Sequence, residues 1–291
     1  MFSKIVAIVF PIYAMIAAGY IYGRWKRPDM AFANELNMDV FVPALIFAAL
    51  AAKSFAIDQH LPMALGATLV VFGTGLLAWP LARVLGVATN TFVPPMMFKN
   101  SGNMGLPLMV LAFGEQALPA AIVLFFVENT LHYALGIWML DHRARLWNLW
   151  RVPVIAAALA GLAVSLTRFE VWQPLWLGVK MLGDVAIPLL LFSLGVRLCD
   201  SRLAAWRIGL AGALVSPAAG MLTALAANAA LGLSGRDAAM LLLFGALPPA
   251  VLNYIFAERY RQEPDRVASI VLLGNSAALA IIPLTLAWVL D

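Results

Sequence analysis

A nine-residue pattern occurs twice in this chain, at a separation close to half the chain length. Asp39–Phe47 reads DVFVPALIF and Asp184–Phe192 reads DVAIPLLLF, 145 positions later in a chain of 291 residues. Five of the nine positions are identical, and they include an aspartate and a proline, which rarely occur together in apolar sequence. An internal repeat at half length predicts a chain built from two related halves that share one architecture.

The composition indicates whether these halves fold in water or in a membrane. Hydrophobic residues make up 63% of the chain and charged residues 12%, whereas soluble domains are about half apolar and about a quarter charged. Apolar stretches long enough to cross a bilayer recur from end to end. We therefore expect an all-α polytopic membrane protein that contacts membrane lipids. Its net charge of +4 then reflects basic loops at the membrane surface, and no nucleic-acid partner is expected.

The cysteine content excludes a disulfide, and the first apolar segment does not have the pattern of a signal peptide. The single cysteine, Cys199, excludes an intrachain disulfide and a cysteine metal cluster, so neither a metal nor another cofactor is expected. The first apolar segment runs into basic residues and lacks a small-residue cleavage site, which predicts a retained helix instead of a signal peptide.

The apolar stretches predict ten helices in two sets of five. The expected ranges are 3–23, 30–52, 61–82, 91–113, 117–140, 152–167, 174–197, 207–231, 237–257 and 267–290. The first repeat then covers residues 1–140, a short cytoplasmic linker 141–151, and the second repeat 152–291. The repeated pattern falls in the second helix of each half. Because five is odd, the second half enters the membrane from the opposite side, so the repeat is inverted.

The basic residues predict the orientation of the chain. The connections after the odd-numbered helices hold thirteen lysines and arginines, whereas the opposite side holds four, which are Lys4, Lys53, Arg168 and Arg236. Cytoplasmic loops carry the excess of basic residues. We therefore expect the connections after odd-numbered helices in the cytoplasm and both termini on the non-cytoplasmic side.

The fourth and ninth predicted helices contain residues that interrupt a helix. The stretch 94–107 carries three prolines, two glycines, two asparagines, a serine and a lysine, and the ninth helix carries Pro248, Pro249 and Asn253. Proline removes a backbone donor, and an interrupted helix survives in lipid only against protein or a wet cavity. Paired interruptions at corresponding positions are typical of a transporter's binding site, and half-helix N-termini suit an anion.

Three stretches of the chain together resemble the auxin efflux carrier family. They are Asn100–Pro107, Pro248–Tyr260 and the second-helix pattern through Pro43 and Phe47. The resemblance covers nearly the whole chain. It implies two inverted five-helix repeats with helices 4 and 9 crossing near the midplane, a scaffold part and a moving transport part, an elevator-like cycle and a homodimer. Family members carry organic anions, including auxin in plants and dicarboxylates such as malonate or malate in bacteria.

The chain departs from many plant members of that family at one place. Their long hydrophilic loop between the fifth and sixth helices is represented here only by the short linker 141–151. The loop that is usually phosphorylated to control such transporters is therefore missing here. It favours a bacterial protein of the cytoplasmic (inner) membrane.

The interrupted segments supply the predicted substrate-binding residues, which are Lys99, Asn100, Ser101, Asn103 and Asn253. Their amides can bind a carboxylate or satisfy the backbone groups that the break frees. Lys99 can attract an anion and exchange a proton, or it can pair with Asp39 or Glu128 or extend to a membrane surface. The residues expected to shape the crossover are Gly102, Gly105, Pro107, Pro248 and Pro249.

Four further residues are candidates for ion or proton coupling, namely Asp39, Glu128, His132 and Asp184. Glu128 and His132 lie one helical turn apart and share a face, so they can relay a proton or satisfy each other. For the two aspartates of the repeat we favour a structural role, in which each holds a loosened backbone ahead of the proline four positions later.

These features favour a secondary transporter (permease) of a small organic anion such as a mono- or dicarboxylate. The alternative is a sodium/proton antiporter or a sodium-coupled organic anion symporter of the same fold group. An antiporter is expected to carry an acidic pair in mid-helix, and here Glu128 is followed by Asn129. The sequence contains no Gly-rich phosphate loop and no protease or zinc motif, so an enzyme is not expected. A channel stays open as an alternative, and the sequence specifies neither the acid nor the coupling ion.

Overall fold

The computed structural model describes residues 2–52, 57–142, 150–199 and 205–290. All regular structure in these ranges is helical. Four of the basic residues that entered the orientation argument, Lys53, Arg143, Arg145 and Arg202, lie outside the described residues, as does most of the predicted linker 141–151.

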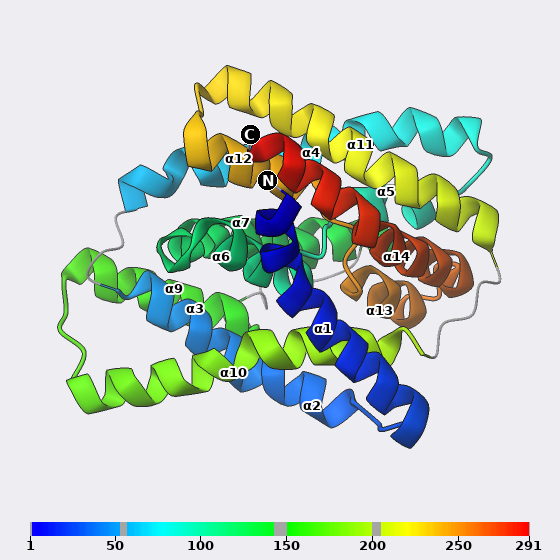
Figure 1. Cartoon of the computed structure of the whole chain (residues 1–291). Coiled ribbons are helices and arrows are strands. Elements are labelled where there is room, and N and C mark those ends of the chain that lie inside the picture. The colour runs from blue at the N-terminus through cyan, green and yellow to red at the C-terminus, as the bar shows by residue number, and fades with distance from the viewer. Residues whose placement is uncertain (1, 53–56, 143–149, 200–204, 291) are drawn as a thin grey trace.

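The helices follow one another along the chain with only short connections (Figure 1). They are α1 (Phe2–Lys26), α2 (Ala31–Leu36), α3 (Val42–Leu50), α4 (Ile57–Val84), α5 (Thr89–Met97), α6 (Leu106–Phe113), α7 (Leu118–Leu131), α8 (Ile137–Leu140), α9 (Pro153–Thr167), α10 (Gln173–Arg197), α11 (Trp206–Leu231), α12 (Gly235–Ala246), α13 (Leu252–Arg259) and α14 (Pro264–Val289). A 3₁₀ turn, η3 (Glu115–Ala117), precedes α7. There are also three wider π-turns: η1 (Asn37–Phe41) joins α2 to α3, η4 (His132–Gly136) joins α7 to α8, and η2 (Ser101–Gly105) leads into α6.

Each predicted range contains a helix or an interrupted run of helices. Seven helical runs in the described part of the chain are long and apolar enough to cross a membrane. The other three predicted ranges hold the short helix α9 and the two runs that are interrupted, α5–α6 and α12–α13. The chain is therefore an all-helical, multi-pass membrane protein, and the number of ten crossings stays a prediction.

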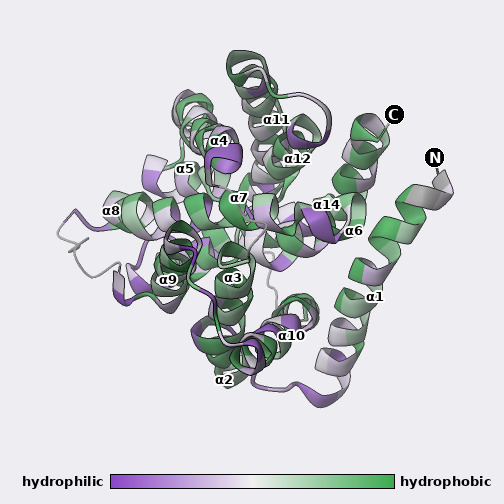
Figure 2. Cartoon of the chain, turned by 90° about the vertical axis from the view of Figure 1, so that its left-hand side faces the viewer, coloured by the Kyte–Doolittle hydropathy of each residue, from purple (hydrophilic) through white to green (hydrophobic). Residues whose placement is uncertain are grey.

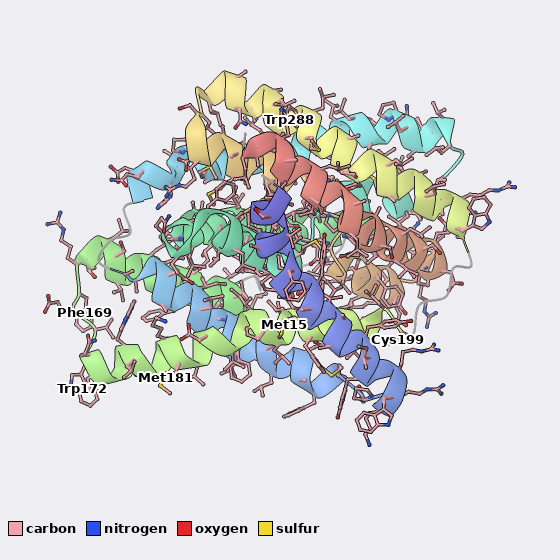
Figure 3. All side chains as sticks on the ribbon, in the orientation of Figure 1. Met15, Phe169, Trp172, Met181, Cys199 and Trp288 are labelled. Carbon is pink, nitrogen blue, oxygen red and sulfur yellow. The ribbon has the colours of Figure 1, made fainter. Side chains whose placement is uncertain are left out.

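The outer surface is apolar, as a lipid solvent requires. The green of hydrophobic residues runs along most helices in Figure 2. Large side chains such as Phe169, Trp172, Met181 and Trp288 project outward in Figure 3, and Trp172 is 72% exposed. Exposure on this scale is costly in water but favourable against hydrocarbon chains.

The helices pack into two groups (Figure 1). In the first, here named the α10 group (α1–α3, α9 and α10), α10 packs against α1 and α3, and α3 packs against α9. In the second, the α11 group (α4–α8 and α11–α14), α11 packs against α14, α12 and α4. Close backbone contact joins α1 to α10, where a Cβ on Gly195 would lie 2.0 Å from the carbonyl oxygen of Ile16. Small residues permit such contacts between membrane helices.

The two copies of the repeated pattern lie side by side within the α10 group. The Asn37 amide, at the start of η1, donates to the carbonyl of Ala186 in α10 (3.4 Å). The backbone is loosened at Asp39, which lies in the π-turn. The same expectation is wrong at Asp184, because α10 runs without interruption through Pro188 and the Asp184 carboxylate pairs with Lys180 (3.2 Å). One missing N–H is not enough to break this long helix.

Candidate functional site

The two predicted interruptions are confirmed, and they meet. Helix α5 ends at Met97 and α12 ends at Ala246, and after each helix the backbone becomes extended. The N–H of Asn100 donates to the carbonyl of Pro248 (2.7 Å), and the N–H of Ala250 donates to that of Phe98 (2.9 Å). Because Pro248 and Pro249 have no N–H, the second segment cannot donate the bonds of a continuous helix, and the pairing satisfies backbone groups of both segments. We call this antiparallel pairing the crossover.

Two asparagines hold the crossover from the side. The Asn253 amide donates to the carbonyls of Phe98 (3.1 Å) and Ala250 (2.9 Å). Asn275 of α14 donates to the carbonyls of Pro249 (3.0 Å) and Val271 (2.8 Å). Both N–H groups of Asn275 are thereby used, so its side-chain oxygen is fixed as the acceptor for the amide of Asn100 (2.7 Å). This chain of bonds fixes the orientation of Asn100.

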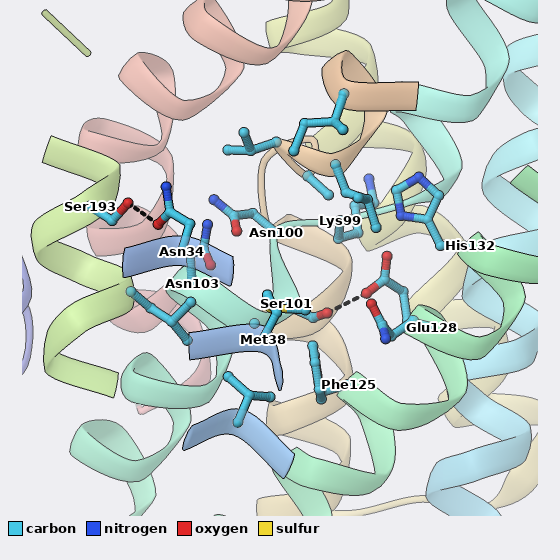
Figure 4. A pocket seen from close by; sticks show the side chains of 18 of the residues that line it. Asn34, Met38, Lys99, Asn100, Ser101, Asn103, Phe125, Glu128, His132 and Ser193 are labelled. Carbon is cyan, nitrogen blue, oxygen red and sulfur yellow. Dashed lines mark hydrogen bonds between the residues drawn. The ribbon is translucent and has the colours of Figure 1, made fainter. Parts of the chain in front are cut away.

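A cavity of about 440 Å³ lies beside the crossover, and both helix groups line it. The α10 group contributes Asn34, Met38 and Ser193, and the α11 group contributes Asn100, Ser101 and Glu128 (Figure 4). All three π-turns border the cavity through Met38, Ser101 and His132. Wide turns of this kind are frequent at functional sites. A volume in this range suits a small molecule.

The structure brings together most of the residues that the sequence predicted for the site. Those that line the cavity are Lys99, Asn100, Ser101, Gly102, Asn103, Glu128 and His132. The remaining crossover residues, Gly105, Pro107, Pro248, Pro249 and Asn253, lie outside its lining. Asn253 therefore supports the crossover backbone from behind. The aspartates of the repeat are also outside the lining: both are exposed, and Asp184 faces away on α10.

Lys99 is almost fully buried, at 1% exposed, and its ammonium group points into the α11 group. The ammonium donates to the carbonyl oxygen (2.7 Å) and the hydroxyl oxygen (2.8 Å) of Ser216 in α11. The ion pair with Asp39 that was one expectation is thus wrong, because Asp39 is exposed on η1. A buried cation directly behind the crossover leaves a positive potential at the cavity wall.

Glu128 and His132 share a face of the fifth helical run as predicted, but each has its own contacts. The Ser101 hydroxyl donates to Oε2 of Glu128. His132 stacks on Phe98, with ring centroids 4.1 Å apart and planes 7° from parallel, and meets the edge of Phe256. Both side chains are 2% exposed.

Several residues of the site were missed by sequence reasoning. They are Asn34, Glu35, Ser193, Arg197, Arg259 and Asn275. Arg197 and Arg259 looked like loop charges because they end α10 and α13, yet both reach the cavity. Asn275 could have been identified from the sequence, since an asparagine in the middle of the last apolar helix is as unusual as the asparagine at position 253.

The role of Asn275 leads to a stability prediction. Asn275→Leu leaves the Pro249 carbonyl and the Asn100 amide without partners in a buried place, which costs about 1–3 kcal/mol of unfolding free energy. Thermal unfolding in detergent measures the effect. The control is Thr285→Val on the same helix, which removes a bond to the Ile281 carbonyl one turn away and a long contact with the Met221 sulfur (3.9 Å). Equal midpoints for the two variants would contradict a special role for Asn275.

Comparison with known proteins identifies relatives along the whole chain. The sequence model of a family described as Membrane transport protein matches residues 4–145 and 142–286. A protein of Rhizobium meliloti (strain 1021) named "Putative malonate transporter" is 25% identical over 306 residues, which cover 96% of this chain and 93% of that protein. An uncharacterized transporter of Methanocaldococcus jannaschii is 22% identical, with 97% and 98% covered. Auxin efflux carrier component 6 of Arabidopsis thaliana is 25% identical over 184 residues, which cover 59% of this chain and 29% of the plant protein.

Proposed function

Because this chain belongs to the Membrane transport protein family, it is a membrane transporter and not an enzyme, and we propose that it is a secondary transporter (permease) of a small organic anion. The similarity to plant auxin efflux carriers confirms the resemblance found in the sequence. The proposed substrate class is a mono- or dicarboxylate. Malonate is the first candidate, because the name of the Rhizobium meliloti relative specifies it.

One observation carries this proposal, namely the cavity beside the crossover. Its wall combines amides and hydroxyls of the interrupted segments, and two basic residues at helix ends, Arg197 and Arg259, also line it. Lys99 adds a buried positive charge behind the crossover. Amides, hydroxyls and cations are the groups that bind a carboxylate, and the apolar remainder of the wall excludes water.

The position of the cavity supports an elevator-like cycle. It lies between the α10 group and the α11 group, so movement of one group against the other would expose it to each side in turn. We assign the α10 group as the scaffold and the α11 group as the moving part, because the latter contains the crossover.

Contacts between the two halves support the inverted repeat. The Thr74 and Thr223 hydroxyls lie 3.2 Å apart, and these residues are 149 positions apart in sequence. Lys99 pairs with Pro249 at nearly the same separation. A pseudo-two-fold axis produces this pattern, because residues near the axis lie next to their own counterparts. We propose ten crossings, with helices 4 and 9 crossing near the midplane.

The remaining assignments follow from the charges of the loops and from the family. We propose a bacterial cytoplasmic membrane location with both termini on the non-cytoplasmic side, since basic residues gather after the odd-numbered helices. The proposed homodimer rests on the resemblance to auxin efflux carriers.

A stability-shift screen of the purified protein tests the function. A ligand that binds only the folded state stabilises it by about 2.7 kcal/mol at a hundred times its dissociation constant. We expect malonate or another small carboxylate to raise the unfolding temperature, and 1,3-diaminopropane, of similar length but opposite charge, to have no effect. A shift with sodium alone, and with no acid, would favour the sodium/proton antiporter instead.

A further inference from the structure

The two oxygens of the Glu128 carboxyl group have different surroundings. Oε2 accepts a hydrogen bond from Ser101 (Figure 4), whereas Oε1 is buried without a hydrogen-bond partner among the described residues. The amide nitrogen of the next residue, Asn129, is also buried without such a partner. Both residues line the cavity. Buried polar groups without partners are rare, and here they mark the place where a ligand would complete the bonding.

The groups around Glu128 compensate its charge only in part. The titratable and charged residues that share its cavity are Glu35, Lys99, His132, Tyr133, Arg197 and Arg259. The backbone N–H and the charge of Lys99 favour an ionised Glu128, but the Lys99 ammonium is itself bonded to Ser216 in α11. His132 stacks on Phe98 and meets the edge of Phe256, Glu35 is exposed, and the two arginines end α10 and α13. An ionised carboxylate with one bare oxygen in a dry wall is costly, so this site favours the neutral acid.

An organic anion in the same cavity strengthens this preference. Two negative charges within a space of about 440 Å³ repel each other. A protonated Oε1, by contrast, becomes an O–H donor in the cavity wall, and a carboxylate would supply its missing acceptor. The Asn129 amide would donate to the same anion.

We propose that Glu128 is a proton-binding site that couples transport of the organic anion to one proton. This inference rests on the proposed function. A proton from water joins Oε1 on the side where the anion binds, and it holds the anion by a hydrogen bond. When the cavity opens to the other side, the anion leaves, water enters and solvates the carboxylate, and the O–H bond breaks to release the proton to that water. One proton therefore moves with each anion, and Glu128 returns unchanged.

The coupling can be measured as proton uptake during malonate binding. With the wild-type protein in weak buffer, above about pH 7 where malonate is fully ionised, the affinity should fall by up to about tenfold per pH unit as the pH rises, with uptake of up to about one proton per malonate bound. The sign follows from the neutral acid being the binding form, so affinity is present at lower pH and lost as Glu128 ionises.

Variants separate Glu128 from the other titratable groups. Glu128→Gln keeps a neutral side chain, so malonate affinity should become independent of pH and proton uptake should vanish. Asp184→Asn, which removes an exposed carboxylate outside the cavity, should keep the wild-type profile. Ser101→Ala removes the donor that stabilises the ionised form, so the fall in affinity should move to higher pH.

The outcomes distinguish this inference from the function on which it rests. A wild-type protein that binds no carboxylate contradicts both. Malonate binding with no proton uptake and no pH dependence contradicts the proton site alone. If the malonate affinity of a folded Glu128→Gln variant still depends on pH, another group such as Lys99 binds the proton, and the role of Glu128 is overturned. If that variant does not fold, the wild-type uptake and the Ser101→Ala shift decide the question.

Discussion

Replacing Asn100 with alanine is expected to abolish carboxylate transport and to leave a folded protein. The Asn100 side chain lines the cavity at 3% exposure, and its orientation is fixed by the bond to Asn275. A hydrogen bond to a charged group contributes about 1.5–3 kcal/mol, so its loss should weaken carboxylate binding roughly ten- to hundredfold. Uptake of labelled malonate into proteoliposomes and malonate binding in detergent measure the two effects.

A matched variant shows whether the effect belongs to the site. Asn90→Ala removes the same side chain from α5, in the same interrupted segment but outside the cavity lining. It should transport malonate like the wild-type protein. Normal transport by folded Asn100→Ala would remove the crossover amide from the substrate site and with it the main support for that assignment.

Replacing Gly220 with valine is expected to have the largest effect on stability. Helices α11 and α12 touch through their backbones here, since a Cβ on Gly220 would lie 2.0 Å from the carbonyl oxygen of Gly245. The same Cβ would lie 3.0 Å from the Lys99 ammonium. Overpacking costs about 1–3 kcal/mol where side chains can adjust, and more than about 3 kcal/mol is expected where a backbone must move. The thermal unfolding midpoint and the yield of monodisperse protein report this cost.

Gly178 provides the control for this experiment. It also lies inside a long helix, α10, but a Cβ there would meet nothing within 4 Å. Gly178→Ala should therefore be neutral or stabilise by up to about 1 kcal/mol, because alanine favours the helix. A Gly220→Val variant as stable as Gly178→Ala would contradict the close packing of α11 on α12.

The interrupted helices connect the stability of this protein to its site. Residues 98–100 and 248–250 pair with each other, and this pairing satisfies backbone groups that the two interruptions free. The same interruption removes a helical turn from the interior and leaves room for polar side chains. The residues that break the helices are therefore also those that place Asn100 and Ser101 at the cavity wall.

Much of the architecture could be predicted from the sequence, because few backbone conformations are stable in lipid. A segment that crosses hydrocarbon must satisfy its backbone internally, so apolar stretches predict helices with bounds close to those of α1, α4, α10 and α14. For the same reason the prolines of 94–107 and 248–249 predicted where two helices are interrupted. The candidate residues Asn100, Ser101 and Glu128 followed from their rarity in apolar surroundings, and all three line one cavity.

Only the tertiary structure decided which partner each polar group meets. The direction of the Lys99 ammonium depends on Ser216, which is 117 positions away, and that of Asn100 depends on Asn275, 175 positions away. The two copies of the repeated pattern also differ in structure, with a π-turn at Asp39 and a continuous helix at Asp184. Local sequence encodes whether a backbone can stay helical. The contacts of a buried side chain are set by helices far away in the chain, whose packing no local pattern describes.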